Sequence, residues 1–399
     1  MTKPSDKKKL TRGEKWLLVA PLFFAALFFG VIWFRNKTKP IVPYLIIRFP
    51  KNEVIAAADL SSDSELLAIS GGRRFGPGSG IVRVHRVATG QLERSFVAGD
   101  THQLQALSFS PDGNSLASGF SETYIWNLHN SKTLLLRDGV NKKKVGGWGG
   151  AGSLAFSPDN RVLALANGQN FNGGVARLWD ARAGMFLRFV NNGSNTNKSV
   201  PSASSFSHFD PLFSSDGKTL AVIAYDVQRQ KGTLPRPPVK NVRFSVGKVQ
   251  LWDVKTSKLK RVLPLEAAGA LAFSRNSEMI VAASDESWAH PQLNAYNSKT
   301  GRLMWSFEGA NSPDFDSFPR GKTVFGGLVF SPDNRFLFAS QHRGLSIIDA
   351  SNGKLLREID FPASGTSKGK IDVSDDGKIL LTHFDDGVAL WNTDDWNKP

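Results

Sequence analysis

The sequence predicts an all-β protein: a seven-bladed β-propeller of four-stranded antiparallel blades, preceded by one transmembrane α-helix. Two observations carry this prediction. A short apolar run followed by a polar turn recurs seven times along the chain, and one uncharged apolar segment lies near the N-terminus. A repeat at this period is typical of propellers and solenoids, and an apolar segment of about 20 residues is long enough to cross a bilayer.

Composition narrows the class of protein. The chain has 399 residues, of which 41% are hydrophobic, so it can bury a sizeable core. The absence of cysteine excludes disulfides, zinc–thiolate sites and cysteine nucleophiles. The net charge of +15 is uneven, because residues 1–52 contain 11 Lys and Arg against two acids. A nucleic-acid-binding protein is expected to have a basic stripe on its folded domain, so this distribution argues against nucleic acid.

The N-terminal residues predict a membrane anchor. Trp16 to Phe34 contains no charged residue and spans about 28 Å as a helix. Residues 1–15 form a basic tail before it, and residues 35–43 form a linker after it. The alternative is a cleaved signal peptide, which would have a shorter apolar region and a small-x-small cleavage site. The segment ends instead in the bulky residues 31–34, so we expect an uncleaved anchor that contacts the lipid bilayer.

The charges that flank this segment predict its orientation. Six Lys and Arg residues precede it, and three follow it closely, at 35, 37 and 39. Because the more basic flank tends to stay in the cytoplasm, we expect a single-pass membrane protein with a cytoplasmic N-terminus. The large domain, residues 44–399, is then extracytoplasmic.

The repeated turns define the blades. In most of them a large apolar residue is followed by serine, one variable residue, and aspartate or asparagine. The aspartate or asparagine falls at 63, 112, 159, 216, 276, 333 and 376, a spacing of 43 to 60 residues. Such residues favour tight turns, because aspartate bonds its own backbone and glycine accepts positive φ. A second and a third short strand follow in each unit, and a fourth follows in every unit except the seventh, which makes one blade per unit.

The third strands carry a recurring signature: Tyr124-Ile-Trp-Asn, Arg177-Leu-Trp-Asp, Gln250-Leu-Trp-Asp, Ser346-Ile-Ile-Asp and Ala389-Leu-Trp-Asn. These residues resemble the WD40 repeat family, whose Trp-Asp signature is matched at 179–180 and 252–253. The resemblance covers residues 44–396 and implies four-stranded blades around a central channel. The Gly-His pair that usually opens a repeat is missing, so the family's buried Asp–His–Ser–Trp network is not expected. A propeller of this kind implies no particular function.

Closure of the ring can be inferred from the two ends of the domain. The seventh unit supplies strands at 371–373, 379–383 and 388–392, and it lacks a fourth. Residues 44–49 read as a strand without a unit of its own. We expect this strand to complete the last blade, because closure protects the edges of the sheets. The alternative is a loose linker that follows the membrane segment.

Loop lengths predict which face binds partners. The second-to-third and blade-to-blade connections are long, whereas the others are tight, and the two long classes share one face of a propeller. Long loops on a rigid scaffold are where binding concentrates. Aromatic and arginine side chains anchor interfaces most often, and the candidate contacts, which are mainly of these kinds, are Arg73, Arg74, Phe75, Lys142, Lys143, Lys144, Trp148, Phe171, Arg236, Trp288, His290, Phe315, Phe318 and Arg320.

The sequence contains no convincing catalytic, cofactor or metal motif. Residues 147–152 match GxGxxG, but a strand is expected directly after them, where dinucleotide binding needs a helix. The seven histidines show no metal-ligand spacing, and the repeated carboxylates sit where turns need them. Asp314 and Asp316 could bind a cation, but their loop lacks the ligand density of a calcium site.

Two functional classes therefore stay open. The leading hypothesis is a membrane-anchored scaffold, not an enzyme, that binds protein partners through the long-loop face. The alternative is a propeller enzyme or small-ligand binder with a site at the channel mouth. Three or more His, Asp or Glu side chains that converge there would favour the alternative.

Overall fold

The computed structural model describes residues 43–49, 53–73, 80–98, 104, 106–119, 122–136, 153–166, 174–191, 211–225, 247–284, 292–309, 325–341, 344–361, 367–384 and 387–396. These residues all belong to one compact unit, Pro43–Pro399, and Met1–Val42 form another. The expected tail and membrane segment, residues 1–34, lie outside the described residues. In the part of the chain that is described, no helix has the length and apolar character needed to cross a membrane.

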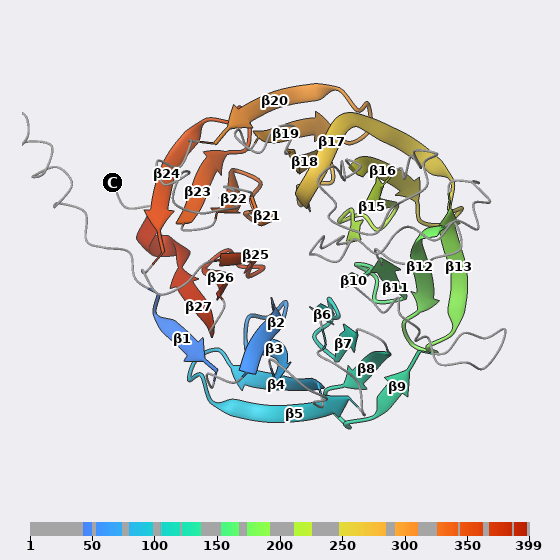
Figure 1. The fold of residues 1–399 in the computed structure, drawn as a ribbon, viewed down its shortest axis with the longest axis vertical. Helices are drawn as coiled ribbons and strands as arrows, with labels where there is room; N and C mark the ends of the chain where they lie inside the picture. The colour runs from blue at the N-terminus through green and yellow to red at the C-terminus, as the bar shows by residue number, and fades with distance from the viewer. Residues whose placement is uncertain are drawn as a thin grey trace, which may run out of the picture. The chain divides into compact units, whose positions relative to one another are not determined.

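The propeller unit is a ring of seven antiparallel blades (Figure 1), which confirms the predicted all-β, seven-bladed propeller. The first strand of each blade is innermost and the fourth is outermost. Blades 1 to 3 are regular and contain β2 (Glu53–Leu60), β3 (Leu66–Arg73), β4 (Gly80–Arg86) and β5 (Leu92–Ala98); β6 (Ala106–Phe109), β7 (Ser115–Gly119), β8 (Thr123–Asn127) and β9 (Thr133–Leu135); and β10 (Ser153–Phe156), β11 (Val162–Ala166), β12 (Gly174–Asp180) and β13 (Phe186–Asn191).

Blades 4 and 5 differ from the sequence expectation, because they share one strand. β17 (Leu259–Phe273) is the outer strand of blade 4 and continues as the inner strand of blade 5, which gives one seven-stranded sheet. Ala267 pairs with Gly247 of blade 4 on one side and with Ser284 of blade 5 on the other. The connecting residues 267–270 are Ala-Ala-Gly-Ala, and they contain no proline, aspartate or asparagine. The other strands are β14 (Leu212–Phe213), β15 (Thr219–Tyr225), β16 (Gly247–Asp253), β18 (Met279–Ser284), β19 (Gln292–Asn297) and β20 (Leu303–Glu308).

The last blade is closed by the N-terminal strand, as predicted. Blade 6 contains β21 (Gly327–Phe330), β22 (Phe336–Gln341), β23 (Gly344–Asp349) and β24 (Leu355–Asp360), and blade 7 contains β25 (Ser367–Val373), β26 (Ile379–Phe384), β27 (Gly387–Asn392) and β1 (Leu45–Arg48). β1 pairs antiparallel with β27, from Leu45 opposite Leu390 to Arg48 opposite Gly387. β25 also contacts β2, so the ring of inner strands is continuous. A 3-10 helix, Thr393–Trp396, follows β27.

The core consists of apolar clusters that each lie between two neighbouring blades. One joins blades 1 and 2 around Phe96 and Trp126, and another joins blades 7 and 1 around Leu390 and Leu67. The tryptophans of the third strands, at 126, 179, 252 and 391, are almost completely buried. Blade 1 has His85 at the same position, and burial lowers the pKa of its imidazole. The blades are thus held together by side chains of their flat faces.

Candidate interaction surfaces

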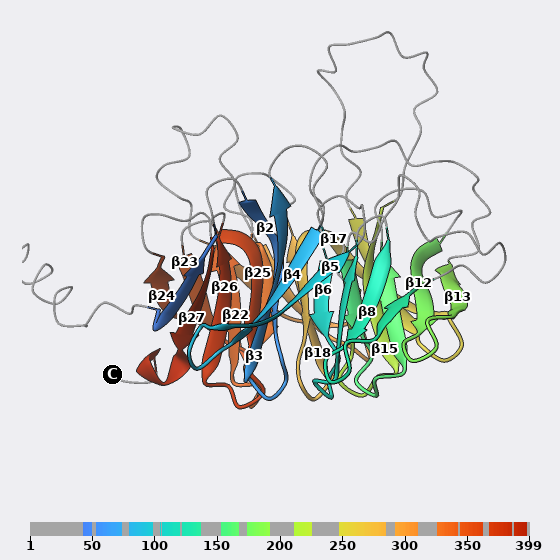
Figure 2. The same cartoon turned by 90° about the horizontal axis from the view of Figure 1, so that it is seen from below.

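The two ends of the propeller differ in how the chain turns. At one end lie the connections from first to second strand and from third to fourth strand, and the described hairpins line this lower edge in Figure 2. We call it the tight-turn end. The other connections leave from the opposite end, the long-loop end. Because β27 runs toward the tight-turn end and β1 is antiparallel to it, the described chain enters the propeller at the tight-turn end, at Tyr44.

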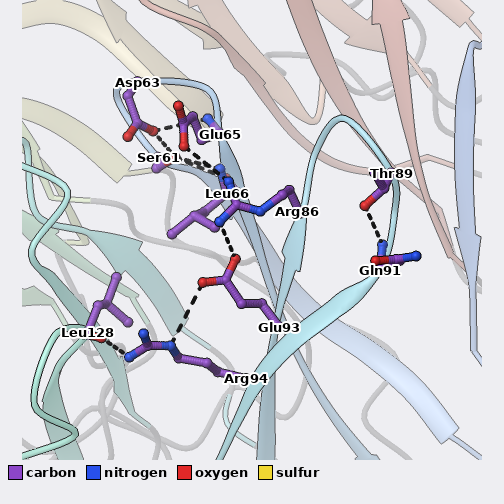
Figure 3. A network of polar contacts seen from close by, with 10 residues as sticks. All are labelled: Ser61, Asp63, Glu65, Leu66, Arg86, Thr89, Gln91, Glu93, Arg94 and Leu128. Atoms are coloured by element: carbon purple, nitrogen blue, oxygen red, sulfur yellow. Dashed lines mark hydrogen bonds and ion pairs between the residues drawn. The ribbon is translucent and has the colours of Figure 1, made fainter.

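The first-to-second turns form an inner ring that is hydrogen-bonded in the same way in all seven blades. In blade 1 the Ser61 hydroxyl donates to the Asp63 carboxylate at 2.6 Å and accepts from the backbone N–H of Leu66 at 2.9 Å (Figure 3). The Asp63 carboxylate also accepts from the backbone N–H of Glu65. The same three bonds recur in the other blades, with Asn276 in place of aspartate in blade 5. The expectation that these carboxylates stabilise turns is confirmed.

These bonds lower the pKa of five turn carboxylates, at 112, 159, 216, 333 and 376. Partial burial alone would raise the pKa of Asp112, but the Ser110 hydroxyl and the backbone N–H of Asn114 outweigh it, and the pKa lies below its usual value. The pKa of Asp376 is lowered as well, mainly by the hydrogen bond from the Ser374 hydroxyl. A carboxylate held in this way is a structural acceptor, because a general acid or base needs a pKa closer to the working pH.

Neighbouring inner turns are also bonded to each other. The side-chain oxygen of Asn160 in blade 3 accepts from the backbone N–H of Asp112 in blade 2 at 3.0 Å, and Asn334 in blade 6 accepts from Arg275 in blade 5 at 2.6 Å. Arg275 also forms an ion pair with Asp375 of blade 7 at 3.2 Å. The inner ring is thus tied together across blades, which makes the tight-turn end rigid.

The third-to-fourth turns form an outer ring and explain the second residue of the Trp-Asp signature. The Asp180 carboxylate accepts from the backbone N–H groups of Arg182 and Ala183, and Asp253 accepts from the N–H and the hydroxyl of Thr256. The bonds from Thr256 are the main cause of the lowered pKa of Asp253. The tryptophan therefore fills the core while the aspartate caps the turn. Blade 1 has Arg86 at this position, and it pairs with Glu65 and Glu93 (Figure 3).

Outer strands cover the outer turn of the next blade. A Cβ on Gly353 would lie 2.6 Å from the Trp305 ring, and one on Gly184 would lie 2.8 Å from Leu134. The indole N–H of Trp305 also donates to the backbone carbonyl of Ala350 at 2.9 Å. These glycines have positive φ, 77° and 66°, so both the conformation and the close approach require glycine.

The outer ring of blades 3 to 6 exposes cations beside apolar side chains. The exposed cations belong to the turns: Arg182, Lys255, Lys258, Lys299, Arg302 and Lys354. The apolar residues begin the following outer strands and are between 37% and 61% exposed: Met185, Leu259, Leu303, Met304, Leu355 and Leu356. We call these twelve residues the basic–apolar rim. Sequence reasoning missed it, although a cation directly before an apolar residue, as at 258–259, 302–303 and 354–355, is a visible signal.

The predicted partner-binding residues fall almost entirely outside the described chain. Arg73 ends β3 at the long-loop end, where its backbone lies opposite Glu53. The remaining candidates lie outside the described residues: Arg74, Phe75, Lys142, Lys143, Lys144, Trp148, Phe171, Arg236, Trp288, His290, Phe315, Phe318 and Arg320. The structure does show that the strands flanking these segments end at the long-loop end. The contacts of the individual residues on the predicted face therefore stay predictions.

Within the described ranges, no group of three or more His, Asp or Glu side chains is placed to hold a metal ion. The strand β10 follows directly after Gly152, as expected, so the GxGxxG match at 147–152 lacks the helix that dinucleotide binding requires. Asp314 and Asp316 lie outside the described residues.

Comparison with known proteins supports the fold. A family model described as outer membrane protein assembly factor BamB matches residues 289–399. No protein of curated function matches the chain. Among solved structures, a chain of the "Crystal Structure of Mitotic Checkpoint Complex" shares 17% sequence identity at a TM-score of 0.61, with 98% of this chain and 96% of that chain covered.

These similarities establish a propeller of repeated blades and no more than that. The BamB-type model covers just over a quarter of the chain, and its matched residues run from the end of blade 5 through blade 7. Matches to 1189 chains of solved structures show that the fold is widely shared, and a widely shared fold does not select a function.

Proposed function

We propose that this protein is a membrane-anchored WD40-like propeller that acts as a scaffold and binds protein partners through its long-loop end. The observation that carries the proposal is the difference between the two ends. All seven inner turns are closed by the same hydrogen bonds, so the tight-turn end is a fixed base. The longer connections all leave from the other end, where a rigid base can hold them in position for binding.

Two further findings support this proposal. The family model that matches residues 289–399 describes an assembly factor, and the similar chain of known structure comes from a protein complex. Both fit a propeller that works through protein contacts. The Trp-Asp residues whose roles in core and turn are described above support the WD40 type.

The anchor is proposed from the sequence of residues 16–34, with the N-terminus in the cytoplasm and the propeller outside. The entry of the chain at Tyr44 adds a geometric consequence. The nine-residue linker before it spans at most about 30 Å, so the tight-turn end faces the bilayer and the long-loop end points away. Extraction at alkaline pH tests the anchor: the full chain stays in the membrane, and a chain without residues 16–34 is released. Release of both would contradict the anchor.

Paired alanine substitutions test the binding face. Phe75, Trp148 and Arg320 represent the long-loop end, and Arg161, Lys218 and Arg335 are exposed control residues at the tight-turn end. Recovery of partners in a pull-down from cross-linked membranes is expected to fall about tenfold or more for an anchoring residue of the first set, and to change little for the second. Equal losses for both sets would contradict the proposed face.

A further inference from the structure

We propose that the basic–apolar rim of blades 3 to 6 contacts the headgroup region of an anionic phospholipid membrane. This inference rests on the proposed anchor and adds the surface by which the propeller itself meets the bilayer. The rim lies at the tight-turn end, because each of its turns joins a third strand to a fourth. The chain enters the propeller at this same end.

The charge of the rim selects an anionic partner. Six exposed cations occupy the turns of four successive blades, at 182, 255, 258, 299, 302 and 354. The same turns contain three carboxylates, Asp180, Asp253 and Asp349, which each accept backbone N–H groups of their own turn, so the six cations outnumber them. Lys260 and Arg261, at the start of β17, are engaged with their neighbours: Lys260 pairs with Asp253 at 3.4 Å, and Arg261 donates to the backbone carbonyl of Lys299 at 3.0 Å. Each lysine or arginine near an anionic membrane surface contributes about 1 kcal/mol to binding, or about fivefold in affinity, so several such residues together strengthen it.

The outer ring differs among the blades. In blade 1, Arg86 is paired with Glu65 and Glu93, at 3.2 and 2.8 Å. Blade 7 has no third-to-fourth turn, because its fourth strand, β1, comes from the other end of the domain. The outer turns of blades 4 and 5 have two exposed cations each, and those of blades 2, 3 and 6 have one each, at 132, 182 and 354. The cations are therefore most numerous around blades 4 and 5.

The apolar residues favour a membrane over an acidic protein. Leu303 and Met304 are 49% and 48% exposed, and Leu355 and Leu356 are 37% and 48% exposed. They belong to four successive blades, one or two in each. Cations mixed with exposed leucine and methionine over an extended surface are typical of proteins that lie at the lipid interface.

Single-cysteine labelling tests the contact directly, because the chain has no cysteine of its own. Thr300 lies in the outer turn of blade 5, on the rim, and Thr89 lies in the corresponding turn of blade 1; both are exposed. Thr300→Cys and Thr89→Cys carry a fluorophore in the full chain, held in nanodiscs with nitroxide-labelled headgroups. In discs that contain phosphatidylglycerol, we expect the label at 300 to be quenched several times more than the label at 89. In phosphatidylcholine alone, or in high salt, the difference should disappear.

Charge reversal supplies the matched control. Lys258 and Lys248 belong to blade 4 and are both exposed, but Lys258 lies on the rim and Lys248 lies at the long-loop end of β16. Lys258→Glu is expected to weaken the anionic-lipid dependence by about fivefold or more, from the contribution of one cation near the surface. Lys248→Glu should leave it unchanged. Equal quenching at both labels, or equal effects of the two reversals, would overturn the proposal.

Failure of the anchor would look different from failure of the rim. Without an anchor, the chain does not enter nanodiscs, and the same two labels are then read in soluble chain mixed with anionic vesicles. The basic N-terminal tail contributes to binding in that assay, but it does not distinguish position 300 from position 89. The rim is supported if the label at 300 is again the more strongly quenched, and it is refuted if the two labels behave alike.

Discussion

Two junctions of the ring are built in opposite ways. Between blades 4 and 5 the chain itself is the link, since β17 runs through from one sheet to the other. Between blades 7 and 1 the ring is closed by β1, whose four residues pair with β27 from the far end of the domain. The first junction needs no long-range pairing, whereas the second brings together residues more than 330 positions apart in the sequence, as in Leu45 opposite Leu390.

The outer strand of blade 7 makes the same kinds of contact with its neighbours as the outer strands of other blades do. Leu45 lies over Gly90 of blade 1, as Trp305 lies over Gly353 at the junction of blades 5 and 6. Gly387 lies against the carbonyl of Ile47, as Gly344 does against that of Ile359. The comparison teaches that β1 is a full outer strand, although it comes from the other end of the chain. The ring is therefore expected to depend on it.

Removal of the closing strand should have the largest effect. A chain that starts at residue 50 loses the β1–β27 ladder and the packing of Leu45, Ile47 and Phe49 against blades 7 and 1. We expect a loss of at least about 5 kcal/mol from the free energy of unfolding, measured by urea denaturation. A chain that starts at residue 43 is the control and should retain full stability. Equal midpoints for the two chains would show that β1 does not close the ring.

Substitution of the glycines that lie beneath the outer strands should have the next largest effects on stability. Gly353→Ala places a Cβ against the rigid Trp305 ring, which also donates a hydrogen bond to Ala350, and it should cost about 3 kcal/mol. Gly90→Ala meets the flexible Leu45 side chain at 3.1 Å and should cost about 1 to 2 kcal/mol. Gly113→Ala, with positive φ and open space, sets the conformational baseline of about 1 kcal/mol. Thermal unfolding measures the order, and a reversed order would contradict it.

An ion pair at the entry to blade 1 should have a smaller effect. Arg83 binds Glu53 through two hydrogen bonds, at 2.8 and 3.2 Å, and its guanidinium lies over the ring of Phe49, just after β1. Both charged side chains are about 20% exposed. Arg83→Ala should therefore destabilise the protein by about 1 to 2 kcal/mol. The better exposed Arg86→Ala should cost under about 1 kcal/mol, and urea denaturation that ranks Arg86 above Arg83 would contradict this.

The turn carboxylates should give the smallest single effect and a pH dependence. The pKa of Asp376 is lowered by the Ser374 hydroxyl and the backbone N–H of Lys378. Because the folded pKa lies below the unfolded value of 3.8, this contribution is present above that pH and is lost as the pH falls through the lowered pKa. Asp376→Asn should change stability at pH 7 by only about 0.5 kcal/mol, since Asn276 fills the same position in blade 5.

Urea denaturation at pH 7 and near pH 3 checks this prediction. The parent chain should lose more stability on acidification than the Asp376→Asn variant does, because the variant has no proton to bind at that turn. Asp394→Asn is a control at a carboxylate outside the inner ring. An identical pH dependence of the Asp376→Asn variant and the parent would show that the turn bond does not favour the ionised form.

The sequence by itself determined the number of blades, the order of strands and the closing role of residues 44–49. Those features depend on local chemistry, because a serine, an aspartate and a following backbone N–H within six residues make a turn wherever they occur. The burial of the third-strand tryptophans follows from the same repeat. The sequence also nominated the long-loop residues, from Arg73 to Arg320, and all but one of them lie outside the described chain.

Only the tertiary structure decided how the blades meet. The fusion of blades 4 and 5 through β17, the cover of Gly353 by Trp305 and the ion pair of Arg275 with Asp375 join residues of different blades. The basic–apolar rim likewise exists only because the ring sets the outer turns of blades 3 to 6 side by side. Such contacts depend on the angle and register between sheets. Turn chemistry inside one blade fixes neither, because both come from packing the whole closed ring.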